Sequence, residues 1–280
     1  MVPWKGWNMK FETLHNEKIP KIGFGTWSIG GGTSPDRSKD ERSLRALRTA
    51  LEVGYTHFDT AEMYASGHSE ELLGQVVRDL GVAREDLFIT SKVSASHLRY
   101  DEVLRACKRS LHNLGMDYLD LYLIHWPSGS IPLKETFRAL NQLVCEEQIR
   151  HIGISNFDVR LMKQAQAESE TPIFTNQVPY SLPDRSYVRN GVLEFCQEND
   201  ILLTAYSPVK EGRLRVNSTL QSIAEAHSAT PYQIALAWLI SQPRVITIPM
   251  SFDPEHIAEN FAAADIELTG DEIEQLDQLA

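Results

Sequence analysis

Eight short apolar runs alternate with stretches of helical spacing along nearly the whole chain. Each run is rich in β-branched or aromatic residues and stops abruptly at polar ones, which is typical of a buried strand. Runs that are each followed by a helical stretch indicate a parallel sheet made of βαβ units. Eight such units in about 250 residues match an α/β fold of the closed (β/α)8 (TIM) barrel type better than an open doubly wound sheet. The runs are residues 22–26, 55–59, 87–91, 118–124, 151–155, 173–178, 201–206 and 245–248.

The stretches between the runs carry apolar residues at the spacing of one helix face. Leu44, Leu47 and Leu51 have this spacing, and a second stripe runs through residues 104–114. We expect each of these stretches to form a helix on the outside of the barrel. Further amphipathic segments lie near residues 70–80, 133–147, 158–167, 188–199, 219–227 and 232–241.

A different pattern precedes the first run. An alternating piece from Lys10 to Leu14 is followed by a polar turn and by Ile19-Pro20, so we expect a small β-hairpin that caps one end of the barrel. No Gly/Ser-rich linker divides the chain, and we expect one barrel domain over residues 1–280, with residues 1–9 a poorly ordered leader. The Gly-rich segment 29–41 is either a flexible surface connection or a flap over a ligand.

Composition excludes several classes of partner. The chain has 38 acidic and 27 basic side chains and a formal net charge of −11, which disfavours nucleic acids and anionic membrane surfaces. No stretch approaches the roughly 18 consecutive apolar residues of a membrane span. Three widely spaced cysteines, Cys107, Cys145 and Cys196, indicate reduced thiols in a cytoplasmic protein. The sequence leaves the oligomeric state open.

Polar residues that could take part in catalysis lie at the ends of three of the strand-like runs. Asp59 ends the second run, Lys92 follows the third and His125 ends the fourth, at separations of 33 residues each. The active site of such a barrel lies at the carboxyl ends of its strands, so we expect these side chains on one rim. Tyr64 lies five residues after Asp59 and is close enough to fold back over that rim.

These four residues together form a coherent acid catalyst. A free tyrosine has a pKa of about 10, and a nearby lysine ammonium favours the phenolate and lowers that pKa. Asp59 would hold Lys92 charged, and a neutral His125 could hydrogen-bond the substrate oxygen. General acid catalysis of this kind is typically worth about 10²–10⁴ in rate.

Each of the four also has a purely structural interpretation. Asp59 could cap the helix that follows it, and Lys92 could be a solvated loop lysine. His125 could be bonded to the backbone at its strand end, and Tyr64 could be an interface aromatic. Four matched residues at strand ends favour the catalytic interpretation.

Longer motifs then identify a family. The chain resembles the aldo-keto reductases from about residue 10 to its end, with the motifs in the family's order. The combination of DTAxxY with a downstream SK and IHWP is specific. The segments are GFGTW at 23–27, DTAEMY at 59–64, SK at 91–92, DLYLIHWP at 120–127, GISNF at 153–157, NQVPYS at 176–181, AYSP at 205–208 and IPMSFDPEHIAEN at 248–260.

The resemblance implies an NAD(P)H-dependent reduction of aldehydes or ketones to alcohols. Tyr64 would be the proton donor to the carbonyl oxygen, Lys92 and Asp59 would tune it, and His125 would orient the carbonyl. The hydride would pass from the nicotinamide C4 position to the carbonyl carbon. The resemblance implies no metal.

The resemblance also implies a set of cofactor-binding residues. Ser155, Asn156 and Gln177 would bind the nicotinamide carboxamide, and Tyr206 would stack on the ring. Ser207 and the loop through Arg213 would lie along the pyrophosphate. The remaining positions expected to contact the cofactor are Gly25, Thr26, Pro208, Val209, Ile248, Pro249, Met250, Ser251, His256, Glu259 and Asn260.

The substrate pocket is less defined by the sequence. Trp27 and Trp126 match aromatic positions that line it, although a lone tryptophan usually packs in a core. The long C-terminal loop of larger family members is absent after the last helical segment, so we expect an open pocket. Small aldehydes, α-ketoaldehydes, diketones and sugar-derived carbonyls all remain candidates.

The adenosine end departs from the family pattern. Many members hold the 2′-phosphate of NADPH with a lysine directly after the IP pair and an arginine six positions further on. Here these positions are Met250 and His256, and neither carries a full charge near neutrality. Ser251 and a helix N-terminus near Asp253 remain. We expect NADPH to be the leading cofactor, with a weakened preference over NADH.

Two other functions compete with this prediction. Some barrels of the family are cofactor-bound regulatory or binding subunits with slow turnover. A metal-dependent barrel hydrolase would need several His and carboxylate ligands at strand ends, and His57 alone does not supply them. We expect His57 to be a packing residue on the same side of its strand as Asp59.

Overall fold

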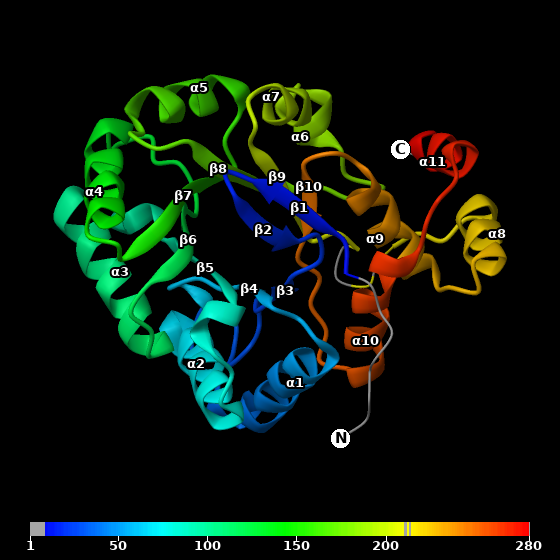
Figure 1. The fold of residues 1–280 in the computed structure, drawn as a ribbon, viewed down its shortest axis with the longest axis horizontal. Helices are drawn as coiled ribbons and strands as arrows, with labels where there is room; N and C mark the ends of the chain where they lie inside the picture. Colours follow the sequence, from blue (N-terminus) through cyan, green and yellow to red (C-terminus); the bar gives the residue numbers. More distant parts are fainter. Residues whose placement is uncertain (1–8, 210–211, 213, 280) are drawn as a thin grey trace.

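The computed structural model describes residues 9–209, 212 and 214–279. Within this part of the chain, eight parallel strands follow one another in chain order, from β3 to β10, inside a ring of helices (Figure 1). The (β/α)8 barrel predicted from the alternating pattern is confirmed. The strands are β3 (Phe24–Gly25), β4 (His57–Asp59), β5 (Phe88–Val93), β6 (Leu119–Ile124), β7 (Ile149–Ser155), β8 (Ile173–Pro179), β9 (Leu202–Tyr206) and β10 (Val245–Thr247).

The first and last strands close the barrel against each other. Ile22 and Thr247 form a parallel bridge. The Gly23 amide donates to the Thr247 carbonyl at 2.8 Å, and the Thr247 amide donates to the Lys21 carbonyl at 2.8 Å. This closure places the segments that follow β3 and β10 side by side, although they lie at opposite ends of the sequence.

The helices cover the outside of the strand ring. The predicted helical segment 188–199 differs, because it is divided into two short helices at Gly191, whose φ of +82° is left-handed. The α-helices that the structure describes are α1 (Asp40–Val53), α2 (His68–Leu80), α3 (Tyr100–Leu114), α4 (Leu133–Cys145), α5 (Val159–Glu168), α6 (Ser186–Arg189), α7 (Val192–Glu198), α8 (Ser218–Ala226), α9 (Pro231–Ser241), α10 (Pro254–Ala262) and α11 (Gly270–Asp277).

Helix α1 buries a face slightly rotated from the predicted stripe. Leu47 is fully buried, whereas Leu44 and Leu51 are only half-buried against the core. The small residues Ser43, Ala46 and Ala50, together with Val53, complete the buried face. Small side chains let a helix lie close to its neighbours, and α1 packs against both α2 and α10.

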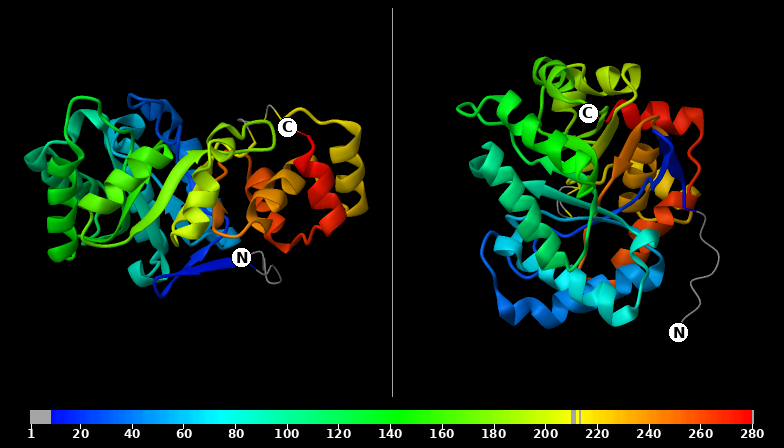
Figure 2. Two further views of the ribbon diagram at one scale, coloured as in Figure 1. Left: turned by 90° about the horizontal axis from the view of Figure 1, so that it is seen from above. Right: turned by 60° about the vertical axis from the view of Figure 1, so that its left-hand side comes forward.

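The predicted N-terminal hairpin is confirmed as β1 (Phe11–Leu14) and β2 (Glu17–Pro20), which pair antiparallel. Its turn residues, His15 and Asn16, both have positive φ, as a two-residue type I′ turn requires. The hairpin crosses the ring of strands at one end (Figures 1 and 2). Leu14 and Ile19 pack there with the barrel's interior side chains at the amino ends of the strands.

Strand β5 shows how the barrel interior changes from apolar to polar. Side chains alternate along a strand, so Phe88 and Lys92 lie on the inner face and Ile89 and Val93 face the helices. Phe88 packs near the hairpin end of the barrel. Lys92, four residues further on, lies at the carboxyl end, where the polar side chains gather.

Candidate active site

The structure brings the four predicted catalytic residues together at the carboxyl ends of neighbouring strands. Asp59 ends β4, Lys92 lies near the end of β5, and His125 directly follows β6. Tyr64 begins the short 3-10 helix η2 (Tyr64–Gly67), which follows β4. All four side chains are largely buried.

Lys92 is the centre of this group. Its side chain is fully buried, and its ammonium contacts the Asp59 carboxylate, the Thr60 carbonyl at 2.8 Å and the Tyr64 hydroxyl at 3.2 Å. Burial is the largest single effect and lowers the pKa of Lys92, but the charges and hydrogen bonds of Asp59 and Tyr64 together outweigh it and raise that pKa above its usual value. Lys92 is therefore a charged, paired lysine, and the solvated-loop interpretation is wrong.

Tyr64 keeps its proton more firmly than the sequence predicts. Burial of the ring raises the pKa of Tyr64, and the Lys92 ammonium lowers it by a smaller amount. The expected effect of Lys92 is present, but the expectation of a net lowered pKa is wrong because desolvation of the phenolate is the larger effect. The resting hydroxyl is a protonated acid.

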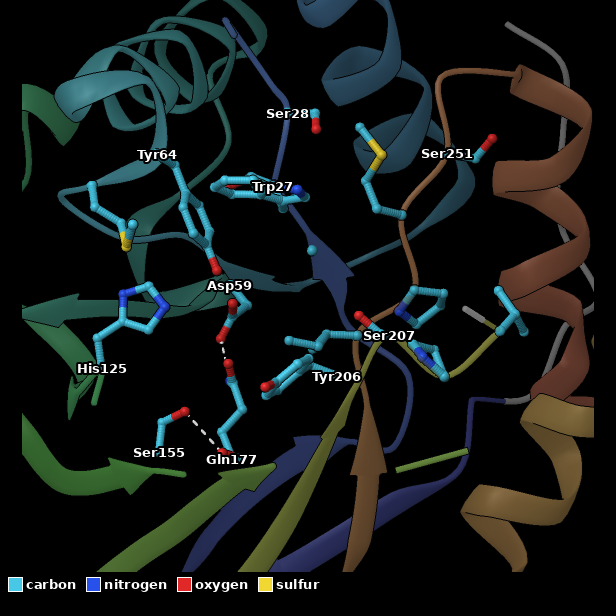
Figure 3. Close-up of a pocket in the computed structure, with 18 of the residues that line it drawn as sticks. Trp27, Ser28, Asp59, Tyr64, His125, Ser155, Gln177, Tyr206, Ser207 and Ser251 are labelled. Atoms are coloured by element: carbon cyan, nitrogen blue, oxygen red, sulfur yellow. Dashed lines mark hydrogen bonds between the residues drawn. The ribbon is translucent and has the colours of Figure 1, made fainter. Parts of the chain in front are cut away.

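The aromatic surroundings fix the Tyr64 ring. Trp27 meets it edge-on with ring centroids 5.1 Å apart, and the His125 ring lies at 5.7 Å, also edge-on. The ammonium of Lys92 lies 4.8 Å from the ring centroid. These contacts leave the hydroxyl end of Tyr64 directed toward Asp59 (Figure 3).

The Gly-rich segment 29–41 supports the turn that carries Tyr64. The Ala65 amide donates to the Gly32 carbonyl at 2.7 Å, and the Ser66 hydroxyl donates to the Thr33 carbonyl at 3.0 Å. Ala65 and Ser66 both have positive φ, which is a costly conformation for residues with a side chain. The bonds to the loop hold this strained turn in place.

His125 is neutral and available to a ligand. Burial, with a smaller effect from the Lys92 ammonium, lowers the pKa of His125 to about 3. Its Nδ1 atom is buried without a partner, and neither ring nitrogen hydrogen-bonds within the part of the chain that the structure describes. The interpretation of His125 as a ring bonded to the backbone is therefore wrong.

A second polar group adjoins the first. Gln177 Nε2 donates to the free oxygen of the Asp59 carboxylate at 2.7 Å, and the Ser155 hydroxyl donates to the Gln177 carbonyl at 2.8 Å (Figure 3). Asn156 donates to the His125 carbonyl at 3.1 Å and accepts from the Tyr206 hydroxyl at 3.0 Å. The two groups thus form one connected network.

One cavity of about 700 Å³ joins these groups to the loop after β10. In Figure 3, Tyr64 and His125 lie toward one end of it and Ser251 toward the other. Its volume lies within the range of ligand and cofactor sites. The predicted residues that line it are Gly25, Thr26, Trp27, Asp59, Tyr64, His125, Trp126, Ser155, Asn156, Gln177, Tyr206, Ser207, Pro208, Val209, Gly212, Ile248, Pro249, Met250 and Ser251.

The other predicted residues lie elsewhere. Lys92 is buried beneath the cavity and reaches it only through Asp59 and Tyr64. His256, Glu259 and Asn260 lie on α10 and do not line the cavity, while Arg213 falls outside the described residues.

Four lining residues escaped the sequence analysis: Ser28, Arg42, Met63 and Phe252. Ser28, Met63 and Phe252 each adjoin a predicted residue, so their positions in or directly beside the motifs could have revealed them. Arg42 lies near the start of α1, outside every motif, and nothing in the sequence points from it to a cavity.

The polar network fits the carboxamide of a nicotinamide ring. Ser155, Asn156 and Gln177 are buried and offer hydroxyl and amide donors and acceptors, and Tyr206 adds a half-buried aromatic face. The cavity wall at Gly25 has no room for a side chain, since a Cβ atom there would lie 2.7 Å from the Ile248 carbonyl oxygen. A flat ring with an amide substituent matches this arrangement of donors and surfaces.

Two features are absent from the described part of the chain. No helix in it is both long and apolar enough to cross a membrane. No three His, Cys, Asp or Glu side chains cluster there as metal ligands do.

Comparison with known proteins identifies relatives over nearly the whole length. Residues 21–280 match the model of the aldo/keto reductase family. Methylglyoxal reductase YeaE of Escherichia coli strain K12 is 38% identical over 266 residues, which is 93% of this chain and 90% of that protein.

Solved structures agree with this result. A thermostable aldo-keto reductase, Tm1743, crystallised with the inhibitor epalrestat, is 47% identical and superposes with a TM-score of 0.93, covering 97% of this chain and 100% of its own. An aldo/keto reductase from Klebsiella pneumoniae, in complex with NADP and acetate, is 39% identical with a TM-score of 0.85, covering 95% of this chain and 93% of its own.

Proposed function

This chain belongs to the aldo/keto reductase family, and we propose that it reduces aldehydes and ketones to alcohols with NADPH or NADH, using Tyr64 as the proton donor. The observation that carries the proposal is the contact of the buried Lys92 ammonium with both the Tyr64 hydroxyl and the Asp59 carboxylate at the cavity wall. The bound dihydronicotinamide supplies the hydride to the carbonyl carbon.

Proton transfer follows from the contacts of Tyr64. Its raised pKa keeps the hydroxyl protonated, so it can donate to the carbonyl oxygen as negative charge develops there. The O–H bond of Tyr64 breaks, the new O–H bond of the alcohol forms, and a phenolate is left behind. Lys92 stabilises that phenolate at 3.2 Å, and Asp59 keeps Lys92 charged.

His125 orients the carbonyl group. A neutral imidazole has one N–H donor, and the lowered pKa of His125 keeps the ring neutral across the physiological range. With its ring beside Tyr64, it can donate a second hydrogen bond to the same carbonyl oxygen. Two donors converge on that oxygen, as electrostatic stabilisation of a developing oxyanion requires.

The nicotinamide ring is held by the second polar group. We assign its carboxamide to Ser155, Asn156 and Gln177 and one ring face to Tyr206. Burial raises the pKa of Tyr206 to about 12, so the hydroxyl stays protonated and keeps its bond to Asn156. This fixes the ring face that is presented to the substrate.

The substrate end of the cavity favours small carbonyl compounds. Trp27 and Trp126 line it with partly exposed indole rings, and Met63 adds an apolar side chain. Among the described residues that line the cavity, Asp59 and Arg42 carry the charged side chains, and Arg42 contacts Phe252 in the loop after β10. We propose α-ketoaldehydes such as methylglyoxal, and this choice is supported by the relative named for that activity.

The test compares the protein with Tyr64→Phe. Cofactor oxidation is followed by absorbance with a nitrobenzaldehyde and with methylglyoxal, using NADPH and then NADH. We expect aldehyde-dependent turnover that falls about 10²–10⁴-fold in Tyr64→Phe, while the Kd for the cofactor stays unchanged.

Other outcomes identify other functions. Tight cofactor binding without turnover in the unaltered protein would support a cofactor-bound binding subunit. Equal turnover of the two proteins would remove Tyr64 from the role of proton donor.

A further inference from the structure

The loop between β10 and α10 lacks the cations that would hold a 2′-phosphate. Met250 is uncharged, and His256 does not line the cavity. The N-terminus of α10 is occupied as well, because the Asp253 carboxylate accepts from the amides of Glu255 at 2.8 Å and His256 at 3.4 Å. A phosphate at this end of the cavity therefore needs its positive partner from another element.

Arg42 supplies a cation from helix α1. It is the one arginine or lysine among the described residues that line the cavity. Its guanidinium carbon lies 4.3 Å from the centroid of the Phe252 ring, which lines the same cavity two residues after Met250. Such a cation–π contact orients the flat guanidinium group above the ring.

The other arginines of α1 are already paired. Arg45 forms an ion pair with Glu41 at 3.3 Å, and Arg48 forms one with Asp79 at 2.7 Å. Arg42 has no carboxylate partner within the described part of the chain, so its charge is available to a ligand.

Helix α1, which carries Arg42, is fixed against helix α10, which begins two residues after Phe252. The Tyr55 hydroxyl, just beyond α1, donates to the Ile257 carbonyl of α10 at 3.1 Å. The Tyr55 and Phe261 rings meet edge-on at 4.9 Å. Figure 1 shows α1 and α10 side by side, as expected from the closure of β3 on β10.

We propose that Arg42 binds the 2′-phosphate of NADPH and so determines the cofactor preference of this protein. The inference rests on the proposed reductase function and assigns to α1 the charge that the loop after β10 lacks. A guanidinium can make two parallel charge-assisted hydrogen bonds to a phosphate. NADH has a hydroxyl at that position and gains little from Arg42.

The experiment measures cofactor binding directly. The Kd values of NADPH, NADH, 2′-AMP and 5′-AMP are determined by calorimetry and by quenching of tryptophan fluorescence. The variant is Arg42→Gln and the matched control is Arg45→Gln, which removes the same charge from the same helix outside the cavity. We expect Arg42→Gln to weaken NADPH and 2′-AMP by about 10-fold or more and to leave NADH and 5′-AMP within about 2-fold.

Each outcome has a distinct meaning. If Arg42→Gln leaves NADPH binding unchanged, or weakens NADPH and NADH equally, the assignment of Arg42 is overturned while the reductase function stands. The same holds if Arg45→Gln has an equal effect, since the cause is then general surface charge. If the unaltered protein binds neither dinucleotide, both the proposed function and the inference fail.

Discussion

The ammonium of Lys92 lies 3.2 Å from the hydroxyl oxygen of Tyr64, with no part of the lysine exposed. An ammonium has three N–H donors and no acceptor, and the contacts with Asp59 and Thr60 use the other two. The Tyr64 oxygen must therefore accept from Lys92. Its own proton is free to point into the cavity, where a substrate carbonyl would receive it.

Removing the ammonium should cost both activity and stability. In Lys92→Met, the Asp59 carboxylate remains buried without its cation, and we expect the free energy of unfolding to fall by about 3–5 kcal/mol. Carbonyl reduction should fall at least about 10²-fold, because the Tyr64 phenolate loses its stabilising charge. Urea denaturation and steady-state kinetics measure the two effects.

A double variant separates the two losses. Lys92→Met with Asp59→Asn removes both charges but keeps an oxygen for the Gln177 bond, so most of the stability should return while activity stays low. If the double variant is no more stable than Lys92→Met alone, the unpaired carboxylate is not the source of the instability.

The pH dependence of reduction should be flat near neutrality. The proposed proton donor Tyr64 would act in its protonated form. Burial raises its pKa, so the proton is retained at least up to the usual phenol pKa of about 10. The pKa of His125 is about 3, so this ring does not titrate near neutrality. We expect kcat/KM to be constant from about pH 6 to 9 and to fall above about pH 10.

Circular dichroism at each pH shows whether the fold is retained over that range. A limb of the profile with its midpoint near pH 7, in protein that is still folded, would contradict the assigned protonation states.

His57 should make the fold sensitive to acid. It is buried inside the barrel, with its ring edge-on to Phe88 at 5.3 Å, and burial lowers its pKa to about 3. The unfolded chain binds a proton below about pH 6.5, so the stability that neutral His57 contributes is present above that pH and is lost as the pH falls toward 3.

The corresponding variant is His57→Gln. The slope of unfolding free energy against pH, between about pH 4 and 6, should decrease by up to about 1.4 kcal/mol per pH unit. The exposed His256→Gln serves as the control and should leave the slope unchanged. An identical slope in His57→Gln would mean that His57 is already protonated in the fold.

A lysine at position 250 should strengthen NADPH binding. Met250 lines the cavity near Phe252, so Met250→Lys adds a second cation beside the proposed phosphate position. We expect the Kd of NADPH to fall about 10-fold and that of NADH to stay unchanged. Leu80→Lys adds the same charge at an exposed site outside the cavity and should affect neither cofactor.

In the unaltered protein, the ratio of the two Kd values should stay below about 10³, since one charge-assisted contact replaces two. A larger ratio would mean that the adenosine end holds NADPH without the usual pair.

Much of the fold and the site could be predicted from sequence periodicity alone. Carboxyl ends of parallel strands must meet at one rim, so Asp59, Lys92 and His125 are brought together by spacing alone. The hairpin could be predicted as well, because alternation on both sides of a polar turn has few other solutions. These features depend on local patterns, which a single sequence displays.

Other features depend on three-dimensional surroundings that no local pattern records. The net direction of the Tyr64 pKa depends on how much water the folded chain excludes, and the effect of Lys92 alone predicts the wrong sign. Arg42 reaches the cavity only because the barrel closes β3 against β10. A helix residue outside every motif gives no sign of such a contact.

The hairpin at the amino end determines from which side the barrel is open to ligands. Leu14 and Ile19 fill that end of the barrel with apolar side chains, so molecules enter and leave the cavity through its other end. Ligands therefore approach Tyr64 and Gln177 from the carboxyl ends of the strands, and a two-stranded segment far from these residues determines that direction of approach.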